Sequence, residues 1–247
     1  MITREIFAKN ILSKSKIYDY TINCYTGCQH GCTYCYARFM KRTTGHIEPW
    51  GDFVDAKVNA SELLQKEISR KPRGGVWVSG VCDAYQPLER KYRLTRQCLE
   101  ILVAYDWPFT IQTKSPLVLR DIDILKRGID VEVGFTITTA DDNMRRLFEP
   151  NAPPINERIR ALDELHKAGM QTFAMIAPML PGAGELPELL QGKADSILID
   201  RMNYRYGDWV YRKYNLEAAM SSEFFYRTAK ELASSFRKMG IEFQVVF

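Results

Sequence analysis

Short apolar runs rich in β-branched residues alternate with helical stretches along most of this chain. The runs are Tyr18–Asn23, Val76–Val78, Phe109–Thr113, Val131–Thr138, Gln171–Ala177 and Ser196–Ile199. Such alternation is typical of strand–helix units around a parallel sheet. The sequence therefore predicts an α/β fold.

Helix signals support this pattern. Leu63, Leu64 and Glu67 follow Asn59, a candidate N-cap, and apolar residues recur on one face of 155–168 before Gly169. A long helix carrying Phe225, Ala229, Leu232 and Phe236 is expected to end at Gly240, with a last strand after it. The length of 247 residues and 46% hydrophobic content suit one domain over 1–247, with a core at about 17–200 and an extension at 201–247.

Three thiols stand close together in a Cys-x3-Cys-x2-Cys run formed by Cys28, Cys32 and Cys35. Thiolates on one short loop are the usual ligands of a [4Fe–4S] cluster. Three ligands leave one iron without a protein ligand, and an open metal position usually binds a substrate or cofactor. The spacing therefore predicts a functional cluster.

A closed metal site is the alternative. Cys24 lies four residues before Cys28, so a four-thiolate zinc or electron-transfer site can be drawn, with His30 as a substitute ligand. Zinc knots usually pair two well-separated ligand couples, whereas these residues crowd one loop. We therefore favour the open cluster and expect Cys24 to be a buried structural thiol.

The cysteine loop resembles the signature of the radical S-adenosylmethionine (SAM) superfamily, and several further segments are similar to its spore photoproduct lyase-like branch. They are KNILSKSKIYDYTINCYTGCQHGCTYCYAR at 9–38, VSGVCDAYQPLER at 78–90, TKS at 113–115, VEVGFTITT at 131–139, LFEPNAPPINERIRAL at 147–162 and APMLPG at 177–182.

The resemblance implies a partial (β/α)6 TIM-like barrel, here followed by a C-terminal helix and strand. It implies that the open iron of the [4Fe–4S] cluster binds SAM, which is reductively cleaved to a 5′-deoxyadenosyl radical that abstracts hydrogen from an organic substrate. It also implies a one-electron reductant of the flavodoxin or ferredoxin type. We expect a monomer.

The resemblance assigns SAM-binding roles to residues at the ends of predicted strands. In the family a short Gly-rich segment receives the SAM amino group and a lysine binds its carboxylate, and the matching residues are Ser79, Gly80, Lys114, Ser115, Thr136 and Arg158. The alternative for Lys114 is a solvated surface lysine, and Thr136 and Arg158 are residue types common in strands and on helix surfaces.

Cys82 matches the cysteine that donates a hydrogen atom to the product radical in spore photoproduct lyase. Tyr36 matches the tyrosine that relays the hydrogen, with Tyr34 as a second match. The alternative for Cys82 is a small buried thiol. The polar residues of the same loop are expected to line the substrate side of the cavity: Asp83, Tyr85, Gln86 and Glu89.

The segment 201–214 interleaves arginine and lysine with tyrosine and tryptophan. Aromatic rings that stack on bases and cations that meet phosphates suit a flipped or single-stranded nucleotide. The leading substrate is therefore a nucleic-acid lesion, in particular a pyrimidine photoproduct. The alternatives are an amphipathic connector in this segment, radical modification of a peptide or metabolite, and a non-catalytic iron–sulfur or zinc protein that binds nucleic acid.

Composition sets the remaining expectations. Six cysteines without a secretory signal indicate a reducing cytoplasm. No apolar stretch approaches the ~20 residues that a membrane span needs. The net charge of +4 permits an anionic partner.

Overall fold

The computed structural model describes all residues, 1–247, and divides into two compact units. The first unit contains residues 1–30 and 37–133, and the second contains residues 31–36 and 134–247. The cysteine loop thus contributes to both units. Each unit is described by itself.

The first unit holds two sheets. The larger one has parallel strands β3 (Tyr20–Ile22), β6 (Val76–Val78) and β7 (Phe109–Thr113), with β2 (Leu12–Lys14) antiparallel to β3. The smaller one contains β5 (Phe53–Lys57) between two neighbours, parallel β1 (Ile2–Ile6) and antiparallel β4 (Tyr25–Thr26). Strand β4 lies immediately before the cysteine run, so this second sheet fixes the start of the loop.

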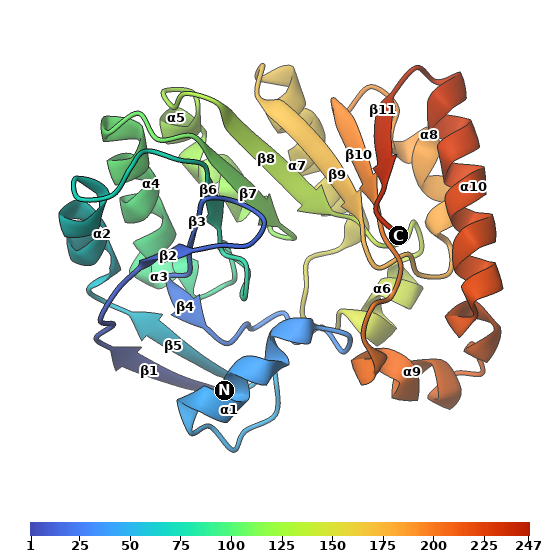
Figure 1. Cartoon of the computed structure of the whole chain (residues 1–247). Coiled ribbons are helices and arrows are strands. Elements are labelled where there is room, and N and C mark those ends of the chain that lie inside the picture. The colour runs from blue at the N-terminus through green and yellow to red at the C-terminus, as the bar shows by residue number, and fades with distance from the viewer. The chain divides into compact units, whose positions relative to one another are not determined.

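Helices α2 (Ala60–Ile68) and α4 (Leu94–Ala104) pack against each other in the first unit (Figure 1). The buried face of α2 includes Leu64. The buried face of α4 includes Leu99 and Leu102, whose spacing of three residues places them on one side of the helix. Asn59 precedes α2 as predicted, but its side chain does not cap the helix and instead bonds both backbone groups of Ala8 at 2.9 Å. The shorter elements are η1 (Tyr36–Met40), α1 (Lys41–Thr44), α3 (Glu89–Tyr92), η2 (Pro116–Asp121) and α5 (Ile122–Leu125).

Strand β8 (Val131–Thr136) begins in the first unit and ends in the second. The second unit continues with parallel strands β9 (Gln171–Ile176), β10 (Ser196–Ile199) and β11 (Glu242–Val245). Its helices are α6 (Asp142–Phe148), α7 (Ile155–Lys167), α8 (Leu186–Leu190), α9 (Asp208–Lys213) and α10 (Ser222–Lys238), with short turns η3 (Ala183–Glu185), η4 (Arg205–Gly207) and η5 (Glu217–Met220).

The long C-terminal helix α10 packs beside β11 (Figure 1). Ser221 caps its first turn by accepting the Phe224 N–H at 3.1 Å, and Gly240 follows its end with a φ of +70°. Phe225, Leu232 and Phe236 face the interior as their spacing predicted. No helix combines the length and apolar character that crossing a bilayer requires.

Candidate cluster loop and cofactor site

Asp83 is a buried carboxylate that holds together three parts of the first unit. Its Oδ1 accepts hydrogen bonds from the Thr113 hydroxyl at 2.6 Å and the Tyr85 N–H at 2.9 Å. Its Oδ2 accepts the Lys114 N–H at 2.8 Å and lies 3.3 Å from Nδ1 of His30. Burial by itself would raise the pKa of Asp83, but the charge of His30 and these hydrogen bonds outweigh it and hold the pKa well below its usual range.

Gln86 fixes the cysteine loop from the same segment. Its side chain accepts the Gln29 N–H at 2.9 Å and donates to the Gly27 carbonyl at 3.3 Å. The Gln29 side chain in turn accepts the N–H of Leu88. Gly27 has a φ of +88°, and a Cβ there would lie 2.3 Å from the carbonyl oxygen of Phe53, so only glycine fits this turn.

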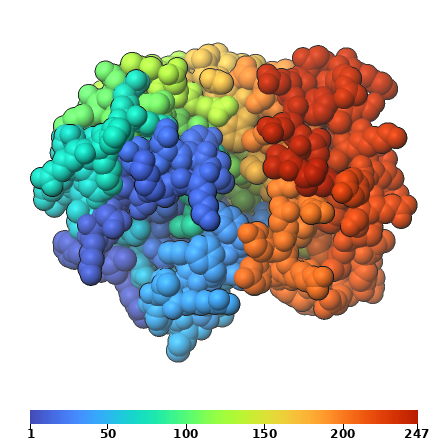
Figure 2. Space-filling model, viewed as in Figure 1, coloured from blue at the N-terminus to red at the C-terminus, as the bar shows by residue number.

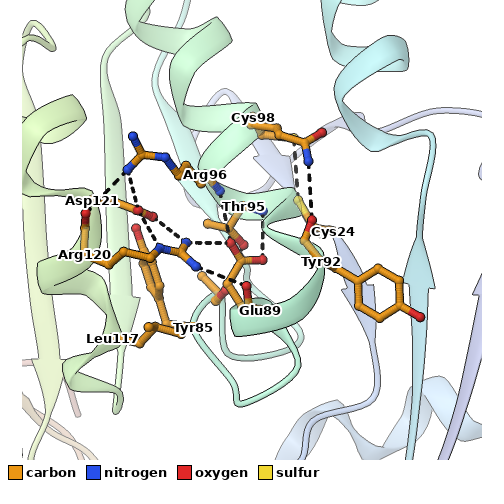
Figure 3. Close-up of polar contacts among 12 residues, drawn as sticks. Cys24, Tyr85, Glu89, Tyr92, Thr95, Arg96, Cys98, Leu117, Arg120 and Asp121 are labelled. Carbon is orange, nitrogen blue, oxygen red and sulfur yellow. Dashed lines mark hydrogen bonds and ion pairs between the residues drawn. The ribbon is translucent and has the colours of Figure 1, made fainter.

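Glu89 is the third residue of this segment that connects it to the residues around the cysteine loop (Figure 3). Its carboxylate accepts the hydroxyl of Tyr25 and the backbone N–H groups of Thr95 and Arg96, at 3.1 and 3.2 Å, so it caps the start of α4. Arg120 pairs with the same carboxylate at 2.9 Å. Burying a carboxylate is costly because it loses its hydration, and here the hydrogen bonds and the ion pair just named compensate for that loss.

Cys24 adds a packing contact beside these polar ties. Its sulfur lies 3.6 Å from that of Cys98 on α4, and both residues are buried and reduced. Burial and the neighbouring thiol raise the pKa of Cys24 well above its ordinary value, with the hydrogen bond to Cys98 as the largest cause. The contact supports the predicted structural role of Cys24.

The segment 83–98 therefore works as a scaffold for the cysteine loop. The sequence-based expectation placed its polar residues on the substrate side of a cavity. The structure places them in the interior instead, each at most 8% exposed: Asp83, Tyr85, Gln86 and Glu89. The side chains of Asp83, Gln86 and Glu89 are bonded to the loop or to neighbouring segments, whereas the hydroxyl of Tyr85 has no hydrogen-bond partner.

Ser79 and Cys82 follow the end of β6. Ser79 has a φ of +68°, a left-handed conformation that costs a non-glycine residue about 1–3 kcal/mol and that concentrates at functional sites. Gly80 follows, and a Cβ there would meet the Trp77 ring at 3.2 Å. The thiol of Cys82 is shielded from water, and this raises its pKa to about 12, although the hydroxyl of Ser79 lowers the pKa in part. Cys82 thus keeps its S–H bond at neutral pH.

Lys114 and Ser115 follow β7. The backbone N–H of Lys114 is bound by Asp83, and the residue is partly exposed. Ser115 is buried and its hydroxyl accepts the Leu117 N–H at 3.3 Å, which caps η2. This capping role is one that sequence reasoning did not assign. Roles of Ser79, Gly80, Lys114 and Ser115 toward SAM remain predictions.

In the second unit, Tyr34 joins a buried network. Its hydroxyl donates to Glu149, which pairs with Arg158 and accepts the Thr138 hydroxyl at 3.1 Å. Arg158 is fully buried and also donates to the carbonyls of Pro153 and Thr136, at 2.9 and 3.0 Å. Arg158 and the buried Thr136 were both assigned to SAM by resemblance. That role stays a prediction, while these contacts show that Arg158 also supports Glu149.

The same unit carries a stack of exposed tyrosine rings. Tyr36 stacks on Tyr204 with ring centroids 5.8 Å apart, and Tyr204 stacks on Tyr206 at 6.1 Å. Gly207 lies against the cysteine loop, and a Cβ there would be 3.4 Å from that of Tyr34, an ordinary contact distance. We call Tyr36, Tyr204 and Tyr206 the tyrosine stack. Residues 201–214 belong to the orange surface in Figure 2.

The cysteines of the run are all reduced. Cys28 and Cys32 are buried and Cys35 is partly exposed. Cys28 belongs to the first unit, and Cys32 and Cys35 belong to the second. Reduced thiols and a loop fixed by many hydrogen bonds fit an iron–sulfur cluster. No three His, Cys, Asp or Glu side chains converge closely enough to enclose a single metal ion.

The family model for the radical SAM superfamily matches residues 22–187. The chain belongs to this superfamily. A protein of Methanocaldococcus jannaschii is 38% identical over 179 residues, which cover 72% of this chain and 67% of that protein. A Mycobacterium tuberculosis protein is 30% identical over 190 residues, and the match spans 56% of its length. The names of both describe them as uncharacterised.

Solved structures show the same fold. Spore photoproduct lyase complexed with dinucleoside spore photoproduct matches with a TM-score of 0.73 and 16% identity, covering 98% of this chain and 81% of that one. Streptococcus suis SuiB bound to its precursor peptide matches with a TM-score of 0.58 and 13% identity, covering 48% of that chain. At such low identity the likeness concerns fold alone, and it confirms the predicted partial (β/α)6 barrel class. SAM binding and radical chemistry follow from the family.

Proposed function

We propose that this radical SAM enzyme acts on a nucleobase of single-stranded or flipped-out nucleic acid, with a pyrimidine photoproduct as the leading substrate. The observation that carries the proposal is the tyrosine stack. Its rings are 38–51% exposed, and Tyr36 directly follows Cys35. Stacking of a base on an aromatic side chain contributes about 1–3 kcal/mol and tolerates any base.

Cations accompany the stack along the same segment. Val210 and Tyr211 are buried in a core cluster against which Tyr34 packs, so this segment is anchored at its middle. The remaining side chains include exposed cations that suit phosphate groups: Arg201, Arg205, Arg212 and Lys213. The exposure of both residue types supports a binding surface over a simple connector.

The residues divide the proposed chemistry among them. Cys28, Cys32 and Cys35 would hold a [4Fe–4S] cluster, which would pass one electron from an external reductant to SAM and so yield methionine and a 5′-deoxyadenosyl radical. We assign binding of the SAM carboxylate to Lys114. The 5′-deoxyadenosyl radical would take a hydrogen atom from the substrate and become 5′-deoxyadenosine. Cys82 would donate its S–H hydrogen atom to the product radical, and Tyr36 would return a hydrogen atom from its O–H bond to the resulting thiyl radical. The tyrosyl radical would recover a hydrogen atom from 5′-deoxyadenosine as SAM is formed again.

The binding step has a direct test with Tyr204→Ala. The variant should bind a fluorescent single-stranded oligonucleotide roughly ten to a hundredfold more weakly in an anisotropy titration, because the middle ring that aligns Tyr36 and Tyr206 for stacking on bases is lost. Tyr226→Ala is the matched control, since Tyr226 is also exposed, at 60%, but lies on α10 outside the stack. Equal affinity of wild type and Tyr204→Ala would remove the support for a nucleobase.

The substrate test uses anaerobically reconstituted protein, SAM and dithionite. Ultraviolet-irradiated and untreated oligonucleotides are incubated in parallel and their nucleosides analysed by mass spectrometry. We expect a repaired or altered pyrimidine in the irradiated sample alone. SAM cleavage that responds to a peptide or metabolite and to neither oligonucleotide would favour the rival substrates.

A further inference from the structure

Asp83 joins two segments of the first unit to which contacts with SAM are assigned. It lies four residues after Ser79, on the segment that follows β6. Its Oδ2 accepts the backbone N–H of Lys114, which follows β7, at 2.8 Å. The same oxygen lies 3.3 Å from Nδ1 of His30 in the cysteine loop. One carboxylate thus connects the ends of two strands and the loop.

Thr113 extends this contact through the turn that carries Lys114. Its hydroxyl donates to Oδ1 of Asp83 at 2.6 Å and accepts the backbone N–H of Ser115 at 2.9 Å. Asp83 and Thr113 are both buried, where hydrogen bonds are stronger than in water. None of these hydrogen bonds uses the Lys114 side chain. The carboxylate therefore fixes the backbone of the turn on both sides of Lys114.

We propose that Asp83 is the positioning residue for Lys114, because it fixes the turn from which the lysine side chain reaches the carboxylate of SAM. The inference rests on the SAM role proposed for Lys114. A side chain starts at its Cα, so a backbone that is held on both sides limits the positions open to the ammonium group. Displacements of about 1 Å at such groups can cost about a hundredfold in function. Asp83 thus affects SAM binding without touching SAM.

The alternative is that Asp83 only stabilises the interior, in which case its loss weakens SAM binding whether or not Lys114 is present. A double-mutant cycle separates the two roles. Calorimetry measures the Kd for SAM on anaerobic, cluster-loaded protein without reductant. Asp83→Asn keeps the size of the side chain but removes one acceptor oxygen. The Kd should rise roughly tenfold in otherwise wild-type protein and less than about twofold in a Lys114→Ala background.

Each other result of the cycle has a definite meaning when the cluster content of the variants is equal. The same loss in both backgrounds would show that Asp83 acts independently of Lys114 and would overturn the inference. An unchanged Kd in Asp83→Asn, with a weakened Kd in Lys114→Ala, would overturn it too but would leave the SAM role of Lys114 intact. An unchanged Kd in Lys114→Ala would remove that role and the inference together.

Thr113 supplies a second pair of variants in case Asp83→Asn does not fold. Thr113→Val removes the hydroxyl that bonds Asp83 and should weaken SAM binding several-fold, whereas Thr113→Ser keeps the hydroxyl and should retain most of the affinity. Thr110→Val is the matched control, because Thr110 is also buried on β7 but lies before the turn. Its affinity should equal that of wild type. Equal affinities of Thr113→Val and Thr113→Ser would contradict the proposal.

Hydrogen exchange follows the turn directly in cluster-free protein, without SAM. The Lys114 amide should exchange roughly tenfold faster in Asp83→Asn, because its acceptor is lost. The part of α4 that carries Leu99 and Leu102 is the internal control and should be unchanged. Equal exchange at Lys114, or faster exchange throughout the first unit, would overturn the positioning role. Neither experiment involves a nucleobase, so its outcome is independent of the proposed substrate.

Discussion

The hydroxyl of Tyr34 and the carboxylate of Glu149 are hydrogen-bonded in the interior of the second unit, where Arg158 neutralises Glu149. Burial and the charge of Glu149 raise the pKa of Tyr34 well above its usual value, so the phenol keeps its proton. Tyr34 lies between Cys32 and Cys35, and Thr33 is bonded to the carbonyl of Phe148. The Phe148-Glu149 pair therefore fixes the second half of the cysteine loop.

The ion pair predicts a large stability loss for Glu149→Gln. Arg158 would keep its charge in the interior without a counter-ion, and breaking a buried pair in this way costs about 3–5 kcal/mol. Glu157→Gln changes an exposed residue next to Arg158 on α7. Its free energy of unfolding should stay within about 0.5 kcal/mol of that of wild type. Urea unfolding of the cluster-free proteins measures both. Equal unfolding free energies for wild type and Glu149→Gln would show that Arg158 finds other compensation.

Strand bounds that rest on continuous apolar runs could be predicted from the sequence. Val76–Val78, Phe109–Thr113 and Ser196–Ile199 have the observed bounds because buried parallel strands require apolar residues on both faces. The sheet containing β1 was missed. Its sequence, ITREI, carries two charges and is largely exposed, so no apolar signal marks it.

The scaffold of the cysteine loop could not be predicted either. From the sequence, Asp83, Gln86 and Glu89 were expected on the substrate side of a cavity, because such side chains are rarely buried without partners. Their partners, such as Tyr25 for Glu89 and Gly27 for Gln86, lie 64 and 59 residues away along the chain. Only the fold brings them together. The cysteine ligands, by contrast, are recognisable because their spacing is local.

The cysteine run predicts that three thiols are needed to hold the cluster and that Cys24 is not. Changing Cys28, Cys32 or Cys35 to Ala should abolish the brown chromophore of the reconstituted protein and SAM cleavage, because each is expected to hold one iron. Cys24→Ala should keep both, since its sulfur packs against Cys98. Visible absorption and iron analysis measure the first outcome. Loss of the cluster in a folded Cys24→Ala variant would favour the closed four-thiolate site.

We expect the side chain of Lys114 to affect SAM binding and not cluster loading. A charge-assisted contact with the SAM carboxylate contributes about 1.5–3 kcal/mol, so Lys114→Ala should weaken SAM binding roughly ten to a hundredfold. The cluster should load normally, because Asp83 binds the backbone N–H of Lys114 and not its side chain. Calorimetry with SAM measures the affinity, with Lys126→Ala, an exposed lysine of the same unit, as control. Unchanged affinity would return Lys114 to the surface-lysine interpretation.

The environment of Cys82 predicts an unusual pH dependence. Burial raises its pKa to about 12, so alkylation of Cys82 in the folded protein should show no inflection near pH 9. In urea the same peptide should titrate at the ordinary value. The unfolded state releases its proton first, so the contribution of Cys82 to stability is present below pH 9 and declines as pH rises toward 12. Mass spectrometry of the alkylated peptide after a pH series detects either behaviour.

The retained S–H bond leads to the last prediction, on radical quenching. Cys82→Ala should still cleave SAM and still consume substrate, because hydrogen abstraction precedes donation. The product radical should then be trapped as adducts with dithionite or oxygen, and less SAM should be recovered per turnover. Tyr36→Phe should form the product but impair that recovery.

Cys98→Ala removes a different thiol of the first unit, which is buried on α4, and is the matched control, with normal product expected. Product analysis by mass spectrometry, with circular dichroism to confirm folding, distinguishes the variants. Normal product at the wild-type rate from Cys82→Ala would exclude the donor role. The lyase-like mechanism would then lose its main chemical support.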